Sequence, residues 1–202
     1  MKQAPLLLCA LLAMMAASCG GESEPTAPIV TPAPTRDPAL VESEAAEGEA
    51  LASCGAVTAE GYCGVRLGMT PEAATAAFPV KLESYESLPD AEPDPARCHE
   101  LFAVEPVTGL SFLVEGGGVR RIDFITPTAR LADGLGVGST AAEIRARFGT
   151  AITETPNVFE PEITDLGVMQ GETKFVFEME NDVVRSWRVG LAPAIDYPAH
   201  CG

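Results

Sequence analysis

Two segments of similar pattern, "FLVEGGGVRRIDF" (residues 112–124) and "FEMENDVVRSWRV" (residues 177–189), decide the fold of this 202-residue chain. Each has a run of alternating apolar and polar residues, a short turn, and a second alternating run. This pattern is typical of an antiparallel hairpin with one buried face. The expected partners across the two hairpins are Phe112–Ile122, Val114–Arg120, Phe177–Trp187 and Met179–Arg185.

A second repeated phrase precedes each hairpin: "GVRLGMTPEAATAAFP" (residues 64–79) and "GLGVGSTAAEIRARFG" (residues 134–149). Thr70 and Thr140 are predicted helix N-caps, because a threonine hydroxyl accepts a hydrogen bond from the first helical turn. Glu143 lies at the capping-box spacing from Thr140. The phrase therefore predicts two short helices, which end at a proline and at a glycine.

The two repeated phrases together predict an α+β fold. Each repeat would contain a helix, one weak strand (near residues 101–104 or 166–170) and a hairpin, and the two tandem helix-plus-antiparallel-meander repeats would form one sheet covered by helices. Repeat one spans about residues 64–129 and repeat two about residues 130–190. Residues 191–202 form a C-terminal tail.

The N-terminal segment predicts export. Residues 1–18 combine a lysine, an apolar run and small residues before Cys19, as in a secretory signal peptide. The small residues before the cysteine resemble the lipobox of bacterial lipoproteins, which implies that Cys19 is lipidated, and Gly20 implies the outer membrane by the same resemblance. The alternative is an ordinary signal peptide, which implies a secreted or periplasmic protein with Cys19 unmodified.

Composition separates a tether from a folded domain. Residues 19–52 are rich in proline, glutamate and alanine, and they predict a disordered acidic tether. Residues 53–202 are long enough to form one globular domain with its own core. The chain has 29 acidic and 13 basic residues, a net charge of −16, which argues against a nucleic-acid partner.

Four cysteines lie in the globular domain. An even number in an exported domain predicts two disulfides, with three possible connectivities. His99 and His200 lie beside two of these cysteines and supply the residue types of a zinc site. Neighbouring strand residues point to opposite faces, however, so we expect disulfides and no metal. The favoured pairing is Cys54–Cys63 and Cys98–Cys201.

The Gly-Met-Thr helix start at residues 68–70, followed by an antiparallel meander, resembles the superfamily of the outer-membrane assembly lipoprotein BamE (SmpA/OmlA). Two tandem copies are similar to the β-lactamase-inhibitory proteins. The resemblance covers residues 64–190 and departs from the motif at Ser139. The first resemblance implies a lipid-anchored envelope protein that binds or scaffolds other proteins. The second implies a periplasmic inhibitor of a hydrolase such as a β-lactamase or a protease.

The sequence contains no G-x-S-x-G nucleophile motif, P-loop or EF-hand spacing. We therefore predict a non-catalytic protein without a cofactor, anchored by lipid to the periplasmic face of the outer membrane and bound to an envelope protein. Aromatic side chains often supply most of the energy of such interfaces. The candidate surface anchors are Tyr62, Tyr85, Phe159, Trp187 and Tyr197.

Overall fold

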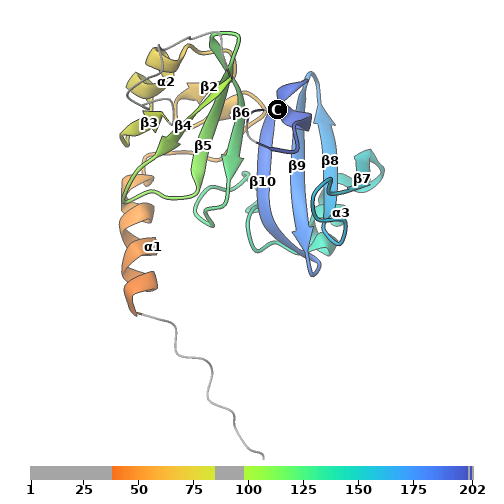
Figure 1. The fold of residues 1–202 in the computed structure, drawn as a ribbon. Helices are drawn as coiled ribbons and strands as arrows, with labels where there is room; N and C mark the ends of the chain where they lie inside the picture. Colours follow the sequence, from red (N-terminus) through yellow and green to blue (C-terminus); the bar gives the residue numbers. More distant parts are fainter. Residues whose placement is uncertain (1–37, 85–97, 200, 202) are drawn as a thin grey trace, which may run out of the picture. The chain divides into compact units, whose positions relative to one another are not determined.

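Antiparallel strands form most of the folded part of the chain. The computed structural model describes residues 38–84, 98–199 and 201. Figure 1 shows its sheet. The strands of the sheet are β3 (Leu82–Ser84), β4 (His99–Ala103), β5 (Leu110–Glu115), β6 (Gly118–Phe124), β7 (Ile152–Pro156), β8 (Thr164–Gln170), β9 (Thr173–Glu180) and β10 (Val183–Leu191). Their order is β3-β4-β5-β6-β10-β9-β8-β7, and every neighbouring pair is antiparallel.

The predicted α+β class is wrong. The molecule is mostly β, with one eight-stranded sheet and a separate two-stranded sheet, rather than two helix-plus-meander repeats. The described helices are short: α1 (Pro38–Ala50), α2 (Pro71–Ala77) and α3 (Ala141–Phe148). The polar segments that form β3 and β7 lack the clear alternation of the hairpins, so the sequence patterns did not identify these edge strands.

The two hairpins have the expected central pairs but a different register near their turns. Phe112 faces Ile122, and Phe177 faces Trp187, which confirms those predictions. Val114 faces Val119 and Met179 faces Val184, so the predicted pairs with Arg120 and Arg185 are wrong. The reason is a register shift in each hairpin, at Leu113/Val114 and at Val184/Ser186. One extra residue bulges from each ladder there.

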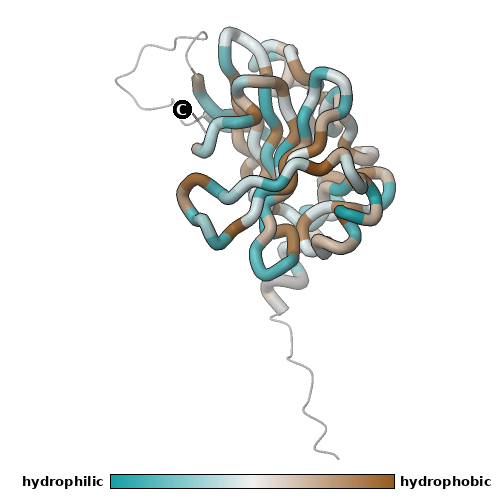
Figure 2. The backbone as a smooth tube through the Cα atoms, turned by 90° about the vertical axis from the view of Figure 1, so that its right-hand side faces the viewer, coloured by the Kyte–Doolittle hydropathy of each residue, from teal (hydrophilic) through white to brown (hydrophobic). Residues whose placement is uncertain are grey.

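The apolar face of the sheet forms the main core. The single tryptophan, Trp187, stacks between Phe124 and Phe177, with ring centroids 4.4 and 5.7 Å away. Trp187 and Phe124 are also register partners across the junction of β10 and β6, so this stack joins the two hairpins through the middle of the sheet. Hydropathy alternates along the strands in Figure 2, as expected for a sheet whose faces differ.

Short helices pack their apolar residues into the same core. Ala74 of α2 and Ile144 of α3 are fully buried. The hydroxyl of Thr70 accepts a hydrogen bond from Ala73 N at 3.3 Å. Thr140 forms the predicted capping box with Glu143, whose carboxylate accepts from Thr140 N at 2.7 Å. Both N-cap predictions are confirmed.

The predicted disordered tether of residues 19–52 is wrong in its second half, where α1 forms. Alanine and glutamate favour helix there, and the end of the helix packs on the domain. The carboxylate of Glu47 accepts a hydrogen bond from the Thr126 hydroxyl, and Leu51 is buried. Residues 1–37, including Cys19, lie outside the described residues. None of the helices in the described ranges is long and apolar enough to cross a membrane.

Two disulfides have the predicted pairing. Cys54 and Cys63 have Cα atoms 4.6 Å apart and flank the start of the small sheet formed by β1 (Gly61–Tyr62) and β2 (Val65–Arg66). Cys98 and Cys201, 5.6 Å apart, link the residue before β4 to the end of the chain. Within the described residues, no group of three or more His, Cys, Asp or Glu side chains is arranged to hold a metal.

Candidate functional site

The face of the sheet opposite the core carries charged side chains, two of which are buried arginines. Arg121 on β6 lies beside the core residue Ile122, and Arg188 on β10 lies beside Trp187. Because strand residues alternate between faces, both arginines point away from the core. Their residues are only 2% and 9% exposed, respectively. Buried arginines need partners for their charge, and two sets of groups surround them.

The first partner is the C-terminal strap, defined as residues 192–199, which includes the short 3-10 turn η2 (Ala194–Asp196). In Figure 1 this dark-blue segment lies over the near face of the sheet. Arg121 Nη1 donates to the carbonyl oxygens of Ala194, Tyr197 and Ala199 at 3.0, 3.2 and 3.3 Å. Arg188 Nε donates to Ile195 O at 3.1 Å. The strap is therefore held by its main-chain carbonyls.

Tyr197 fixes the outer side of the strap. Its hydroxyl donates to the Glu115 carboxylate at 2.9 Å, and this hydrogen bond raises the pKa of Tyr197 above its usual value. Lys174 pairs with Asp196 at 2.6 Å. Arg121 Nε completes its own set of contacts by pairing with Asp123 at 2.8 Å. Contacts from β5, β6, β9 and β10 thus hold the strap against the polar face.

The second partner of Arg188 is a network of carboxylates from β8, β9 and the loop between β7 and β8, which Arg185 of β10 joins. Arg188 forms a short ion pair with Glu178 and a second ion pair with Asp165 at 3.4 Å. Arg185 bridges Glu178 and Glu160, at 3.5 and 3.0 Å. Each carboxylate in this network therefore shares its cation with another carboxylate.

The environment shifts the pKa values of Asp165 and Glu178 in opposite directions. Burial raises the pKa of Asp165, and the nearby charge of Arg188 offsets this only in part. Burial also acts to raise the pKa of Glu178, but the hydrogen bond from Ser186 and the charges of Arg188 and Arg185 outweigh it, so that this pKa lies below its usual value. The network is thus better matched to a charged Glu178 than to a charged Asp165.

These opposite shifts predict opposite pH dependences of stability for two isosteric variants. Because the pKa of Asp165 is raised by folding, ionisation of this carboxyl destabilises the folded wild type as pH rises through that pKa. Asparagine stays neutral, so the unfolding free energy of Asp165→Asn should increase relative to that of the wild type from about pH 4 to pH 7. Ionised Glu178 contributes stability that is lost as pH falls through its lowered pKa, so Glu178→Gln should cost most near pH 7 and least below about pH 4. Urea unfolding at several pH values measures both trends. Parallel trends in the two variants would contradict this description of the network.

A cavity of about 340 Å³ lies between the strap and strands β6, β9 and β10. Its volume is at the lower end of the range of about 300–1,000 Å³ for small-ligand sites. Ser186 supplies a hydroxyl there, which donates to Glu178 at 2.6 Å. A carboxylate with a lowered pKa is a weak base, so this pair is poorly suited to activate a serine nucleophile. The arrangement favours a structural role for the pair.

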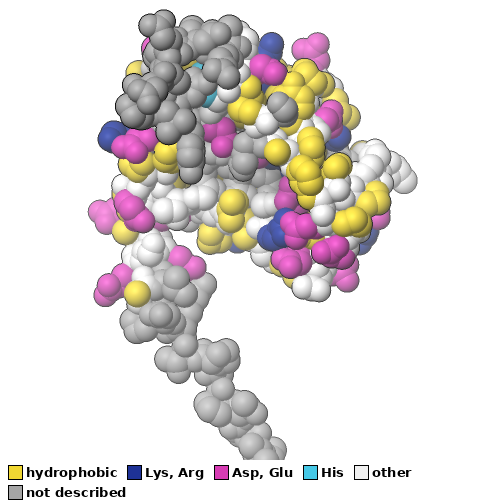
Figure 3. All heavy atoms as spheres, viewed as in Figure 1, with side chains coloured by type: hydrophobic (Ala, Val, Ile, Leu, Met, Phe, Trp, Pro, Cys, Tyr) yellow, Lys and Arg dark blue, Asp and Glu magenta, His cyan; other side chains and the backbone are white. Residues whose placement is uncertain are grey.

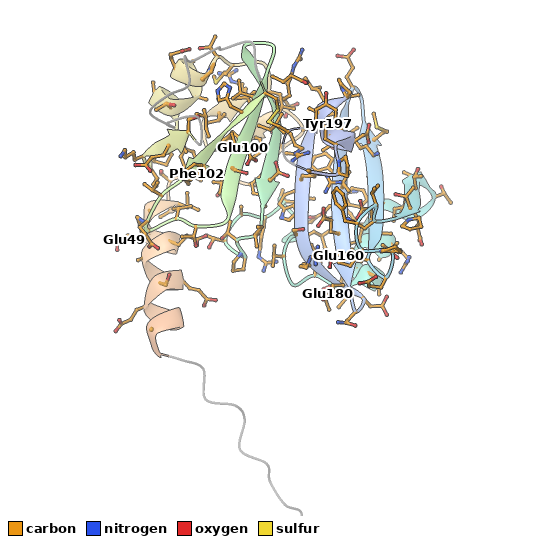
Figure 4. All side chains as sticks on the ribbon, viewed as in Figure 1. Glu49, Glu100, Phe102, Glu160, Glu180 and Tyr197 are labelled. Atoms are coloured by element: carbon orange, nitrogen blue, oxygen red, sulfur yellow. A yellow bond between two sulfur atoms is a disulfide. The ribbon has the colours of Figure 1, made fainter. Side chains whose placement is uncertain are left out.

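Next to this network, a loop held by several hydrogen bonds exposes two apolar side chains. The loop, Asn157–Ile163, connects β7 to β8, and Asn157 N donates to Ile163 O at 2.8 Å across its base. The side-chain oxygen of Asn157 accepts from Phe159 N and Glu160 N at 3.0 and 3.3 Å. Glu160 is also held by the two-point contact with Arg185. Figure 4 labels Glu160 beside β10, and Figure 3 shows basic and acidic side chains gathered there.

Val158 and Phe159 at the tip of this loop are 73% and 67% exposed. The other large exposed hydrophobic side chains in the described part of the chain lie singly: Ile125, Met169 and Val183. Scattered apolar side chains are normal on a protein surface, whereas adjacent ones on an ordered loop are typical of an interaction site. We name residues Asn157–Ile163 the apolar loop.

The structure separates the five predicted aromatic anchors. Phe159 is exposed as predicted, and Tyr197 is half-buried at the strap. The assignments of Tyr62 and Trp187 are wrong: they are 4% and 1% exposed, because both rings pack against Phe124 in the core. Tyr85 lies outside the described residues. Val158, Arg121 and Arg188 are not among the residues predicted from the sequence, although the arginines occupy non-core positions of alternating strands.

Together, the fold and the site define a mostly β protein whose polar sheet face carries a clamped C-terminal strap and an apolar loop. No protein-family model matches the chain, and no curated protein matches it. Among solved structures, it is similar to the crystal structure of the uncharacterized protein yfeY from Escherichia coli, with a TM-score of 0.45 and 10% sequence identity. The alignment covers 68% of this chain and 99% of that chain. The resemblance to outer-membrane assembly lipoproteins stays a prediction from the sequence.

Proposed function

We propose that this chain is a non-catalytic protein of the cell envelope, anchored by lipid, that binds another protein through the apolar loop. The sequence supports the location: small residues end an apolar N-terminal run directly before Cys19, the proposed lipidation site on the periplasmic face of the outer membrane. Acyl labelling that persisted in Cys19→Ala would contradict the anchor.

The observation that carries the binding proposal is the exposure of Val158 and Phe159 on an ordered loop. Leaving apolar surface in water costs about 25 cal/mol per Å², and this cost is recovered when a partner covers it. A loop already held by Asn157 and by the Glu160–Arg185 contact loses little conformational entropy on binding. An exposed, preorganised aromatic residue is the usual centre of a protein interface.

Strand addition at the neighbouring edge strand β7 is a weaker route to binding. The backbone N–H of Asn157 points toward the β8 side. Because backbone groups alternate along an antiparallel ladder, the backbone of Ile152, Glu154 and Pro156 faces the open edge, away from β8. Proline has no N–H, and the N–H of Ile152 already donates to Gly149 O. Glu154 is left as the outward donor of β7, and an edge with so few donors is protected against pairing. The side chains of the apolar loop are the better contact surface.

The alternative function, a periplasmic inhibitor of a hydrolase such as a β-lactamase or a protease, follows from the resemblance of the sequence to tandem-repeat inhibitors and stays a prediction. The adjacent exposed side chains of Val158 and Phe159 support a general protein-binding role and do not single out a hydrolase as the partner.

Site-specific photo-crosslinking in intact cells tests the proposal. A photoreactive amino acid at Phe159 should form a defined adduct with an envelope protein. The matched control is the same amino acid at Met169, which is 57% exposed at the end of β8, and it should form little or none of that adduct. Equal adducts at both positions, or none at Phe159, would overturn the proposed role of the apolar loop.

A further inference from the structure

Beside Val158, the polar face of the sheet contains a recess of about 170 Å³. Its volume is below the range of about 300–1,000 Å³ for whole small-ligand sites, and it suits one inserted side chain. The residues of its wall that matter here are Thr155, Val158, Asp165, Lys174, Arg188 and Asp196. The recess thus combines an apolar rim from the apolar loop with charged walls from β8, β9, β10 and the strap.

The four charged residues that line the recess pair off, Asp196 with Lys174 and Asp165 with Arg188. Arg188 also pairs with Glu178, however, and Arg185 is shared between Glu178 and Glu160. Asp165, Glu178, Asp196 and Glu160 supply four carboxylates, whereas Lys174, Arg185 and Arg188 supply three cations. The network therefore carries an excess of one negative charge, within a chain whose net charge is −16. A cation that entered the recess would neutralise this excess, whereas an anion would be repelled.

Burial makes an incompletely compensated charge more costly at Asp165 than at an open surface. The side chain of Asp165 is 14% exposed, and Arg188 reaches it at 3.4 Å while also pairing with Glu178. Asn157 Nδ2 donates to the other carboxylate oxygen at 3.3 Å. The raised pKa of Asp165, which follows from its burial, agrees with incomplete compensation of this charge.

We propose that the recess receives an arginine side chain of the partner protein, while Val158 and Phe159 contact apolar surface around that arginine. An arginine fits better than a lysine, because a guanidinium is less strongly hydrated and pairs with carboxylates through two parallel hydrogen bonds. Asp165 and Asp196 would accept those hydrogen bonds. This inference rests on the proposed protein-binding function and names the chemistry of the partner.

The first test titrates the isotope-labelled full-length protein with Nα-acetylarginine amide and follows the backbone amide signals by NMR. We expect saturable shifts with a Kd on the order of 1 mM, as is reasonable for a fragment of this size. The shifts should centre on Thr153, Thr155, Gly167 and Lys174, which line or adjoin the recess. The citrulline counterpart has nearly the same shape without the charge and should give no saturable shift.

A matched pair of variants locates the binding. Asp196→Asn should weaken arginine binding by about threefold or more, since one exposed carboxylate partner is lost. Asp133→Asn removes a carboxylate that pairs with Arg147 and lies outside the recess lining, and it should change nothing. Equal shifts with citrulline, shifts centred elsewhere, equal effects of the two variants, or no saturable binding would each overturn the inference.

The two proposals can fail separately. If Phe159 forms its crosslinked adduct but arginine does not bind, the protein-binding role stands and the recess inference is wrong. If arginine binds in the recess but Phe159 captures no protein, the recess is a cation site and the claim that a partner protein supplies the arginine is wrong.

Discussion

Replacing Arg121 with methionine should lower the free energy of unfolding by about 3–5 kcal/mol, the usual cost of removing one partner of a buried ion pair. The Arg121 side chain is 3% exposed, and Asp123 at 17% would keep its charge without its partner. Three main-chain carbonyls of the strap would also lose their donor. Methionine keeps most of the length of the side chain, so the loss reports the charge and hydrogen bonds rather than a large cavity.

Urea unfolding measures this effect, and Arg147→Met is its control. Arg147 pairs with Asp133, but their side chains are 54% and 36% exposed, so that variant should cost about 1 kcal/mol or less. Hydrogen exchange should also increase in the strap of Arg121→Met. If the two variants unfolded at the same urea concentration, the buried clamp would not hold the strap as described.

Local sequence patterns predicted the parts of the fold that depend on local chemistry. The Thr140 capping box and the central hairpin pairs are examples, because each depends on residues that are close in sequence, as Phe112 and Ile122 are across one short turn. The predicted fold class is wrong because β3 and β7 show little alternation of apolar and polar residues. These segments are strands only through pairing with their neighbours. Tertiary context decides such segments.

The site was less predictable for the same physical reason. The role of Arg121 depends on its hydrogen bonds to carbonyls of the strap, which lie more than seventy residues away in sequence. No local sequence pattern predicts such a contact. Trp187 and Tyr62 were assigned to the surface on residue type, but their strand positions bury them. The surface position predicted for Phe159 is correct because this residue lies outside the alternating runs, between Pro156-Asn157 and Pro161, residue types that favour a loop.

The second large effect concerns binding. Phe159→Ala should weaken binding of the protein captured at this position by about 30-fold or more, the change expected for a hot-spot residue that contributes at least about 2 kcal/mol. Because Phe159 is 67% exposed and its backbone holds the loop contacts, the same substitution should change the free energy of unfolding by less than about 0.5 kcal/mol. The loss would then be a loss of contact and not of folding.

The most direct measurement is therefore the Kd of that captured protein for the wild type, Phe159→Ala and Met169→Ala, determined side by side by calorimetry. Met169 supplies an apolar side chain of similar exposure on the same sheet, so it controls for the general loss of exposed hydrophobic surface. If the apolar loop is the binding site, the Kd should rise by about 30-fold or more for Phe159→Ala and by less than about threefold for Met169→Ala. Equal affinities of Phe159→Ala and the wild type would contradict it.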